Sequence, residues 1–295
     1  MSDVTIERVG EVVCELGEGP TWDPLERALY WIDCPAARIW RHDPDSDTTR
    51  SWDVPGDVIG SLALRGAGGV VLAMDQGFHG FDFATGTVET VAAPLAGQDR
   101  TRFNDGKVDR QGRFVAGSLD GEFKDPLGAL YRLDADGGVE EIDRGFIVSN
   151  GPCFSPDGRV LYHCETRAVT IFAYDYDTET GQASNKSPFA SVKDLGIEGR
   201  PDGATVDAEG YVWTALITGG QLARFSADGA LDRLVEVPVR YVTSLCFGGP
   251  DLDVVYITSI GGPLFGTSDE SPSAGGVFAI HGLGVQGLAE PRFRG

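Results

Sequence analysis

Residues 150–187 read NGPCFSPDGRVLYHCETRAVTIFAYDYDTETGQASNKS. The stretch is divided into short runs by PDGR at 156–159, TRA at 166–168 and TETG at 178–181. Runs rich in Val, Tyr and Phe between turns that contain Gly and Asp are typical of a β-meander. This segment therefore predicts four antiparallel strands that follow one another along the chain.

Five other parts of the chain open in a similar way, with a short polar turn that usually contains Gly. Successive openings lie roughly 40 to 50 residues apart, which is the period expected of propeller blades. The repeat predicts an all-β fold, a six-bladed β-propeller with four-stranded antiparallel blades around a central channel, and residues 1–295 as its single domain. The six openings are Glu18-Gly19-Pro20, Gly60-Ser61-Leu62, Asn104-Asp105-Gly106, Asn150-Gly151-Pro152, Asp202-Gly203-Ala204 and Thr243-Ser244-Leu245.

The ends of the chain are predicted to close this ring. Propellers often let the N-terminal strand complete the last blade, so residues 4–13 are expected to pair with residues 276–285. A β-sandwich would also account for the strands, but it would leave the regular period unexplained. No segment shows sustained apolar spacing at the helical period.

Composition excludes several classes of partner. The formal net charge of −21 argues against nucleic acid or an anionic membrane surface, and no apolar run is long enough to span a bilayer. The N-terminus MSDVTIERVGEVV lacks the apolar core of a secretory signal. Five cysteines without a C-x-x-C pair are typical of buried reduced thiols. We therefore expect a cytoplasmic protein, and nothing in the sequence implies a protein partner.

Four of the six openings carry a carboxylate or carboxamide at the equivalent place: Glu18, Asn104, Asn150 and Asp202. The first strand of a blade lines the channel, so these side chains are expected to meet at one mouth. Two carboxylates held together repel each other, and a divalent cation removes that repulsion. Oxygen ligands of these kinds suit Ca²⁺, Mg²⁺ or Mn²⁺. The pattern predicts a metal site with open positions for water and substrate, although any one opening alone is an ordinary turn.

Five motifs together resemble the gluconolactonase/regucalcin (senescence-marker-protein) family of sugar lactonases. The resemblance covers essentially the whole chain in order, and it implies a six-bladed propeller that binds one divalent cation in the channel mouth. The motifs are LGEGPTWDP (16–24), RFNDGKVD (102–109), SNGPCFSPDG (149–158), RPDGATVDAEG (200–210) and AGGVFAIHGLGVQG (274–287).

The resemblance also assigns roles to individual residues of this chain. It implies Glu18, Asn150 and Asp202 as metal ligands. It further implies substrate contacts by Arg102, Asn104 and Glu122.

These residue types suit the hydrolysis of a lactone to its sugar acid. The reaction needs a polarised carbonyl and a stabilised oxyanion, which a cation can supply, and Asp202 is the expected general base on water. The cation is left open among Ca²⁺, Mg²⁺, Mn²⁺, Zn²⁺ and Fe²⁺. A Ca²⁺-binding regulatory protein and an organophosphate hydrolase remain alternatives, although Arg102 with Glu122 favours a polyhydroxylated substrate.

Two stretches depart from the family pattern. Residues 163–166 read HCET where many members carry an Asp in the second strand of the fourth blade. Residues 261–276 read GGPLFGTSDESPSAGG in place of a stretch that usually contains Arg. Both are expected near the channel mouth, where the second could act as a partial lid or be a surface insertion.

Overall fold

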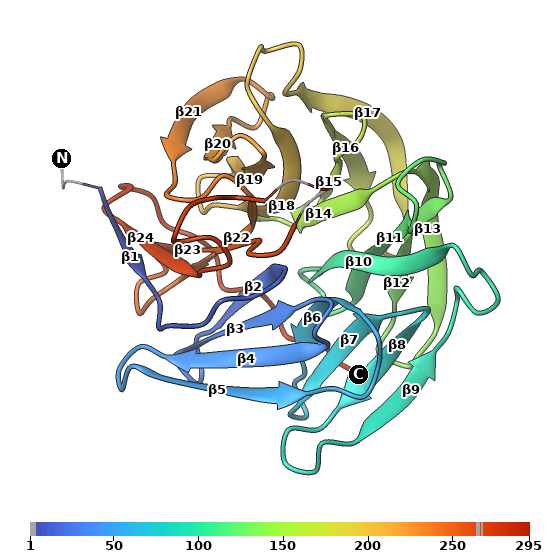
Figure 1. Cartoon of the computed structure of the whole chain (residues 1–295). Helices are drawn as coiled ribbons and strands as arrows, with labels where there is room; N and C mark the ends of the chain where they lie inside the picture. Colours follow the sequence, from blue (N-terminus) through green and yellow to red (C-terminus); the bar gives the residue numbers. More distant parts are fainter. Residues whose placement is uncertain (1–3, 264–265, 267) are drawn as a thin grey trace.

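The computed structural model describes residues 4–263, 266 and 268–295. These residues form six four-stranded antiparallel sheets, arranged as blades around one axis (Figure 1). The predicted six-bladed β-propeller is therefore confirmed, and the β-sandwich alternative is excluded. No helix in the described part of the chain has the length and apolar character that crossing a membrane requires.

Each blade has one strand next to the axis, its inner strand. Each inner strand contains one of the six sequence openings. In each of these inner strands the pairing register with the second strand shifts at the opening. Such a bulge bends the strand and re-aims a side chain, so the openings mark where the strands bend beside the channel. The inner strands are β2 (Gly17–Asp23), β6 (Ile59–Leu64), β10 (Thr101–Val108), β14 (Ser149–Phe154), β18 (Arg200–Val206) and β22 (Val242–Gly248).

The remaining strands follow outward from the axis. Almost every residue of the second strands is buried, whereas the outermost strands are largely exposed. In blade order these strands are β3 (Ala28–Asp33), β4 (Arg38–Asp43) and β5 (Thr48–Asp53); β7 (Val70–Met74), β8 (Gly77–Phe81) and β9 (Val88–Ala92); β11 (Phe114–Asp120), β12 (Gly128–Leu133) and β13 (Val139–Phe146); β15 (Val160–Glu165), β16 (Thr170–Tyr176) and β17 (Ala183–Ser191); β19 (Val212–Ile217), β20 (Gln221–Phe225) and β21 (Leu231–Glu236); and β23 (Val254–Ser259), β24 (Phe278–His281) and β1 (Thr5–Arg8).

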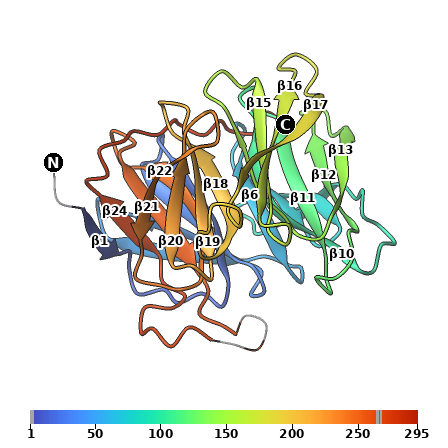
Figure 2. The same cartoon turned by 90° about the horizontal axis from the view of Figure 1, so that it is seen from above.

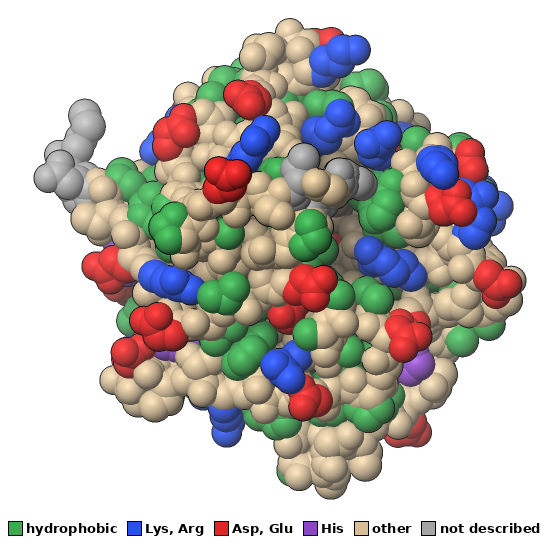
Figure 3. All heavy atoms as spheres, viewed as in Figure 1, with side chains coloured by type: hydrophobic (Ala, Val, Ile, Leu, Met, Phe, Trp, Pro, Cys, Tyr) green, Lys and Arg blue, Asp and Glu red, His purple; other side chains and the backbone are tan. Residues whose placement is uncertain are grey.

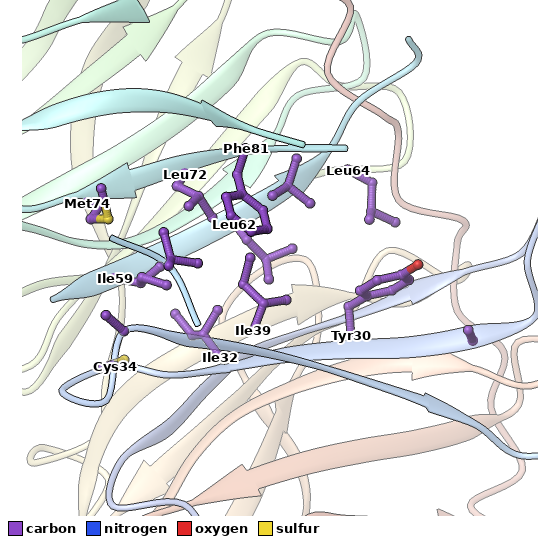
Figure 4. Packing of buried hydrophobic residues seen from close by; sticks show 14 residues of the cluster. Tyr30, Ile32, Cys34, Ile39, Ile59, Leu62, Leu64, Leu72, Met74 and Phe81 are labelled. Carbon is purple, nitrogen blue, oxygen red and sulfur yellow. The ribbon is translucent and has the colours of Figure 1, made fainter. Parts of the chain in front are cut away.

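The hydrophobic core lies between neighbouring blades. Between the first two blades, Ile32 and Ile39 pack with Leu62, Leu72 and Phe81 of the next blade (Figure 4). A single four-stranded blade cannot bury both of its apolar faces, so each blade depends on its neighbours. The five cysteines are all buried and free, as predicted.

The N-terminal strand closes the ring. β1 pairs antiparallel with β24, with Thr5 opposite His281 and Arg8 opposite Phe278. This pairing completes the sixth blade, whose other strands come from the end of the chain. The closure predicted for residues 4–13 and 276–285 is thus confirmed.

After β24, residues 285–295 form a tail across one face of the propeller. The backbone NH of Gly287 donates to Leu252, and that of Phe293 donates to Leu64, at 2.7 and 2.8 Å. On the inner strand β10, Lys107 Nζ lies 3.4 Å from the tail carboxylate of Glu290. Figure 2 shows the C-terminus on the face opposite the loop that joins β23 and β24.

Candidate active site at the channel mouth

A cavity of about 240 Å³ lies at one end of the channel. Figure 3 shows a hollow near the middle of the face seen in Figure 1, with Lys and Arg side chains around part of its rim. Inner strands of five blades contribute polar side chains to the cavity. These are Glu18 from β2, Arg102 and Asn104 from β10, Asn150 from β14, Arg200 and Asp202 from β18, and Thr243 from β22.

Two glycines allow the inner strands to approach closely enough for these side chains to meet. Gly151 follows Asn150 and has φ +48°, a backbone conformation that residues other than glycine rarely adopt. A Cβ atom there would lie 2.5 Å from the carbonyl oxygen of Asp202. At Gly203, which follows Asp202, a Cβ atom would overlap the Ser244 side chain. The glycines of the sequence openings therefore serve close packing between strands as well as turn formation.

A chain of hydrogen bonds orients Asn150. Asn104 Nδ2 donates to Asn150 Oδ1 at 2.6 Å and to the Ser149 carbonyl at 3.0 Å. Asn150 Nδ2 in turn donates to Thr166 Oγ1 at 2.9 Å. Thr166 donates to the Pro201 carbonyl at 2.8 Å, which ties the fourth blade to the fifth. Asn150 thus presents its amide in a fixed orientation, and Thr166 is a site residue that sequence reasoning missed.

The two predicted carboxylate ligands are almost fully buried, with Glu18 8% and Asp202 4% exposed. Burial raises the pKa of Glu18, and repulsion from Asp202 and Asp105 raises it further. Burial also raises the pKa of Asp202, together with repulsion from Asp105. The site therefore concentrates negative charge where water cannot stabilise it.

Asp105 is a third buried acid of this region that sequence reasoning did not single out. Its Oδ2 accepts the backbone NH of Gly151 at 2.9 Å, and its Oδ1 accepts that of Gly106 at 2.8 Å. Burial raises the pKa of Asp105, and the Lys107 ammonium opposes that rise. Asp105 thus fixes the backbone next to Asn150.

The chemistry of the donor set fits a hard divalent cation. Glu18 and Asp202 supply buried carboxylates and Asn150 a carboxamide, and a cation among them would relieve the repulsion described above. Among the described residues, no three His, Cys, Asp or Glu side chains form a group that could hold a metal. A cation in this cavity would therefore need Asn150 beside the two acids, and the predicted ligand set stays a prediction.

Arg102 and Glu122, the two other residues predicted to contact substrate, differ in their position relative to the cavity. Arg102 lines the cavity, and its Nη1 donates to the Phe103 carbonyl at 2.9 Å. Glu122 follows β11 outside the residues that line the cavity; its side chain is 56% exposed and accepts a hydrogen bond from Lys124 Nζ at 3.2 Å. The neighbouring Phe123 lines the cavity instead. The structure does not bring Glu122 to the other site residues, and its contact with substrate stays a prediction.

The unusual sequence at 163–166 has a structural explanation. Glu165 Oε1 accepts the backbone NH of Val148 at 2.8 Å, just before the inner strand of its own blade. Asp33 makes the same kind of contact in the first blade, where Oδ1 accepts the NH of Leu16 at 3.1 Å. Glu165 thus does in the fourth blade what Asp33 does in the first.

His163 lies away from the cavity. The centroid of its ring lies 4.4 Å from that of Phe146, and Nε2 hydrogen-bonds Ser149 Oγ at 2.7 Å.

The other stretch that departs from the family pattern, residues 261–276, includes residues 264, 265 and 267, so the predicted lid falls partly outside the described residues.

Comparison with known proteins identifies the family. The SMP-30/Gluconolactonase/LRE-like region matches residues 16–261. The chain belongs to this family. It is 36% identical over 302 residues to regucalcin of Xenopus laevis, with all of both chains covered. It is 37% identical over 295 residues to a pentonolactonase of Haloferax volcanii, which covers 99% of this chain and 98% of that one.

The fold agrees with a solved structure as well. The calcium-binding protein regucalcin of Agrobacterium tumefaciens matches with a TM-score of 0.90 and 28% identity, over 97% of this chain and 96% of that one. The family expected from the sequence motifs is therefore confirmed.

Proposed function

We propose that this protein is a divalent-metal-dependent lactonase that opens a sugar lactone to the corresponding sugar acid. The observation that carries the proposal is the meeting of Glu18, Asn150 and Asp202, from three blades, in one small cavity. Membership of the family and the likeness to a pentonolactonase support the reaction type. A cavity of about 240 Å³ is small for a ligand pocket, which favours a single sugar ring over an oligosaccharide.

Glu18, Asn150 and Asp202 would hold the cation. When bound, the cation would polarise the lactone carbonyl and stabilise the negative charge that develops on its oxygen. Asn104 supports this arrangement from the third blade, because its amide hydrogen-bonds Asn150. Arg102 and Asn104 would orient the substrate through its hydroxyl oxygens.

Asp202 is the proposed general base. Its carboxylate accepts a proton from water as the water oxygen bonds to the carbonyl carbon, and it returns that proton to the ring oxygen when the C–O bond breaks. The buried position of Asp202 keeps the group poorly solvated, which makes the ionised carboxylate a stronger base. The products are the carboxylic acid and the free hydroxyl of the opened sugar.

A second candidate is a Ca²⁺-binding regulatory role, favoured by the likeness to a calcium-binding regucalcin. Arg102 argues for a catalytic site, because it lines the cavity and adds a positive charge that a simple Ca²⁺ site would not need.

A panel of pentono- and hexono-lactones tests the two candidates. Proton release should exceed spontaneous opening, stop with EDTA and return when Ca²⁺, Mg²⁺, Mn²⁺ or Zn²⁺ is added in excess. Tight Ca²⁺ binding without turnover of any lactone would favour the regulatory role. Turnover that resists complete removal of metal would contradict the metal-dependent mechanism.

A further inference from the structure

Two arginines at the cavity have no part in the mechanism above. Arg167 lies in the turn between β15 and β16, and Arg200 begins β18. Both line the cavity together with Asn150 and Asp202 of the same two blades. Arg167 is exposed and Arg200 is half-buried, whereas Asp202 is almost fully buried. The arginines therefore lie nearer to solvent than the predicted reaction centre.

Neither arginine has an acidic partner in the part of the chain that the structure describes. Among the described residues, no carboxylate forms an ion pair with Arg167 or Arg200, although the chain carries a net charge of −21. Buried arginines elsewhere in the chain are paired, as Arg113 is with Asp109 at 2.5 Å and Arg224 with Asp207 at 2.7 Å. In the described part of the chain some arginines away from the cavity, such as Arg50 and Arg159, also lack an ion pair, so what distinguishes Arg167 and Arg200 is that both line the cavity.

The side chain of Arg200 lies beside the backbone of the turn that carries Arg167. Arg200 Nη1 lies 3.4 Å from the carbonyl oxygen of Thr166 and 3.5 Å from that of Arg167. These long contacts leave most of the donors of Arg200 available. Both residues line the same cavity, so an anion bound there would be attracted by two positive charges. The planar fork of arginine suits carboxylate and phosphate oxygens in particular.

We propose that Arg167 and Arg200 form an anion subsite, and that the substrate is a sugar lactone with an anionic oxygen group distant from its reacting carbonyl. The inference rests on the proposed lactonase function for the reaction, but the subsite itself rests on the two arginines. The lactone carbonyl would lie deep in the cavity near Asp202. The anionic group, a carboxylate or a phosphate, would lie at the mouth.

Matched substrates test the preference. An aldarolactone carries a free carboxylate where the aldonolactone of the same ring size carries a hydroxymethyl group, and a third lactone carries a phosphate on that position. The wild-type protein should give a higher kcat/KM with one of the two anionic lactones than with the neutral one, and the better of the two identifies the anion. In Arg167→Gln/Arg200→Gln the ratio of anionic to neutral kcat/KM should fall at least about tenfold.

Arg159→Gln is the matched control. Arg159 is an exposed arginine that precedes β15, at the opposite end of that strand from Arg167. Its substitution removes one positive charge outside the cavity lining and should leave the ratio unaltered. An equal ratio in the wild-type and double-variant proteins would overturn the proposal.

Binding of inert ligands separates this proposal from the proposed function. Calorimetry would compare a methyl uronide with the neutral methyl glycoside, and a methyl glycoside phosphate would form the third arm. An anionic ligand should bind at least about tenfold more tightly than the neutral one, and Arg167→Gln/Arg200→Gln should abolish the difference. If no lactone is hydrolysed but this difference is found, the lactonase function fails and the anion subsite stands. Equal affinities throughout would overturn the subsite, whether or not lactones are hydrolysed.

Discussion

Asp202 combines two demands that a protein seldom places on one side chain. Its burial and the nearby charge of Asp105 raise its pKa and so oppose its ionisation, and the proposed reaction needs it ionised. A cation bound beside Asp202, as proposed, would reconcile these demands, because it would stabilise the carboxylate form. The residue should therefore be sensitive to the loss of its charge even when its shape is kept.

We expect Asp202→Asn and Glu18→Gln each to lower lactone turnover by at least about 100-fold, the scale of lost acid–base or metal function. Initial rates of proton release, corrected for spontaneous opening, would measure the effect. Asp194→Asn is the control, because Asp194 is an exposed acid away from the cavity lining. Rates near those of the wild-type protein in both variants would contradict the assignment.

His163 should make stability depend on pH. Burial, reinforced by the nearby Lys186 ammonium, lowers the pKa of His163 to about 3. Below pH 6.5, the ordinary pKa of histidine, His163 is protonated in the unfolded chain but stays neutral in the native protein. Acid therefore lowers the free energy of unfolding. His163 should contribute a loss of about 1.4 kcal/mol for each pH unit between pH 6.5 and about 3.

Urea unfolding at about pH 7, 6 and 5 tests this dependence. His163→Gln keeps a donor and an acceptor for Ser149 but cannot take up the proton, so its stability should fall less steeply than that of the wild-type protein. Other acids of the site titrate in both proteins, and their effects cancel in the comparison. Parallel pH profiles would show that His163 is not the cause.

For individual residues, the sequence repeat predicts which side chains occupy equivalent positions in different blades. It identified Glu18, Asn104, Asn150 and Asp202, which all line the cavity. Sequence analysis did not single out Asp105. Three other openings carry glycine at the equivalent position (Gly19, Gly151 and Gly203), and the acid in place of glycine was the only sequence feature that could have pointed to Asp105. Thr166 could not be found, because its role depends on a contact between two blades.

Among the elements, the bulged inner strands decide the geometry of the site. Each bends at its opening, and close approach between β14 and β18 sets the distance between Asn150 and Asp202. Turn spacing predicted these strands correctly. It could not predict the bulges, because a bulge depends on the register of two strands rather than on either sequence alone.

Gly151→Ala tests the need for close approach. The new Cβ atom would meet the Asp202 carbonyl oxygen at 2.5 Å in a left-handed conformation, so we expect a loss of about 3 kcal/mol in unfolding free energy and a large loss of turnover. In Gly86→Ala the backbone is also left-handed, with φ +71°, but no atom lies within 4 Å of the new Cβ. This control should lose only about 1 kcal/mol and keep its activity. Equal losses in the two variants would mean that backbone strain alone explains the effect.

For the whole molecule, the tail of residues 285–295 joins blades that are distant in sequence. It brings Glu290 to Lys107 inside the ring, where the two side chains are only 14% and 15% exposed. Arg110 Nη1 lies 3.6 Å from the same carboxylate. This crossing could not be predicted from the sequence, because the tail has no strand pattern and the residues it contacts lie far away along the chain. Ring closure by β1, in contrast, follows from the repeat itself.

Removal of one partner should be costly at this buried pair. Glu290→Gln leaves Lys107 without its carboxylate, and we expect a loss of about 3 kcal/mol in unfolding free energy. Lys107→Met added to Glu290→Gln removes one of the two positive charges that lost this carboxylate and should recover part of that loss. Denaturant unfolding of the four proteins in this double-mutant cycle measures the coupling. Strictly additive losses would show that the pair does not interact energetically.

The pairing of β1 with β24 has a consequence for biosynthesis. Translation delivers β1 before β24, with strands β2–β23 between them, so β1 must wait for the five other blades before the strand it pairs with exists. Until then the nascent protein is an open arc with an unpaired edge at each extremity, and such edges can pair with other chains. Final ring formation joins contacts of very long sequence separation, which makes it a slow step. A chaperone that shields the nascent arc should therefore raise the yield of this protein more than it changes the stability of the finished ring.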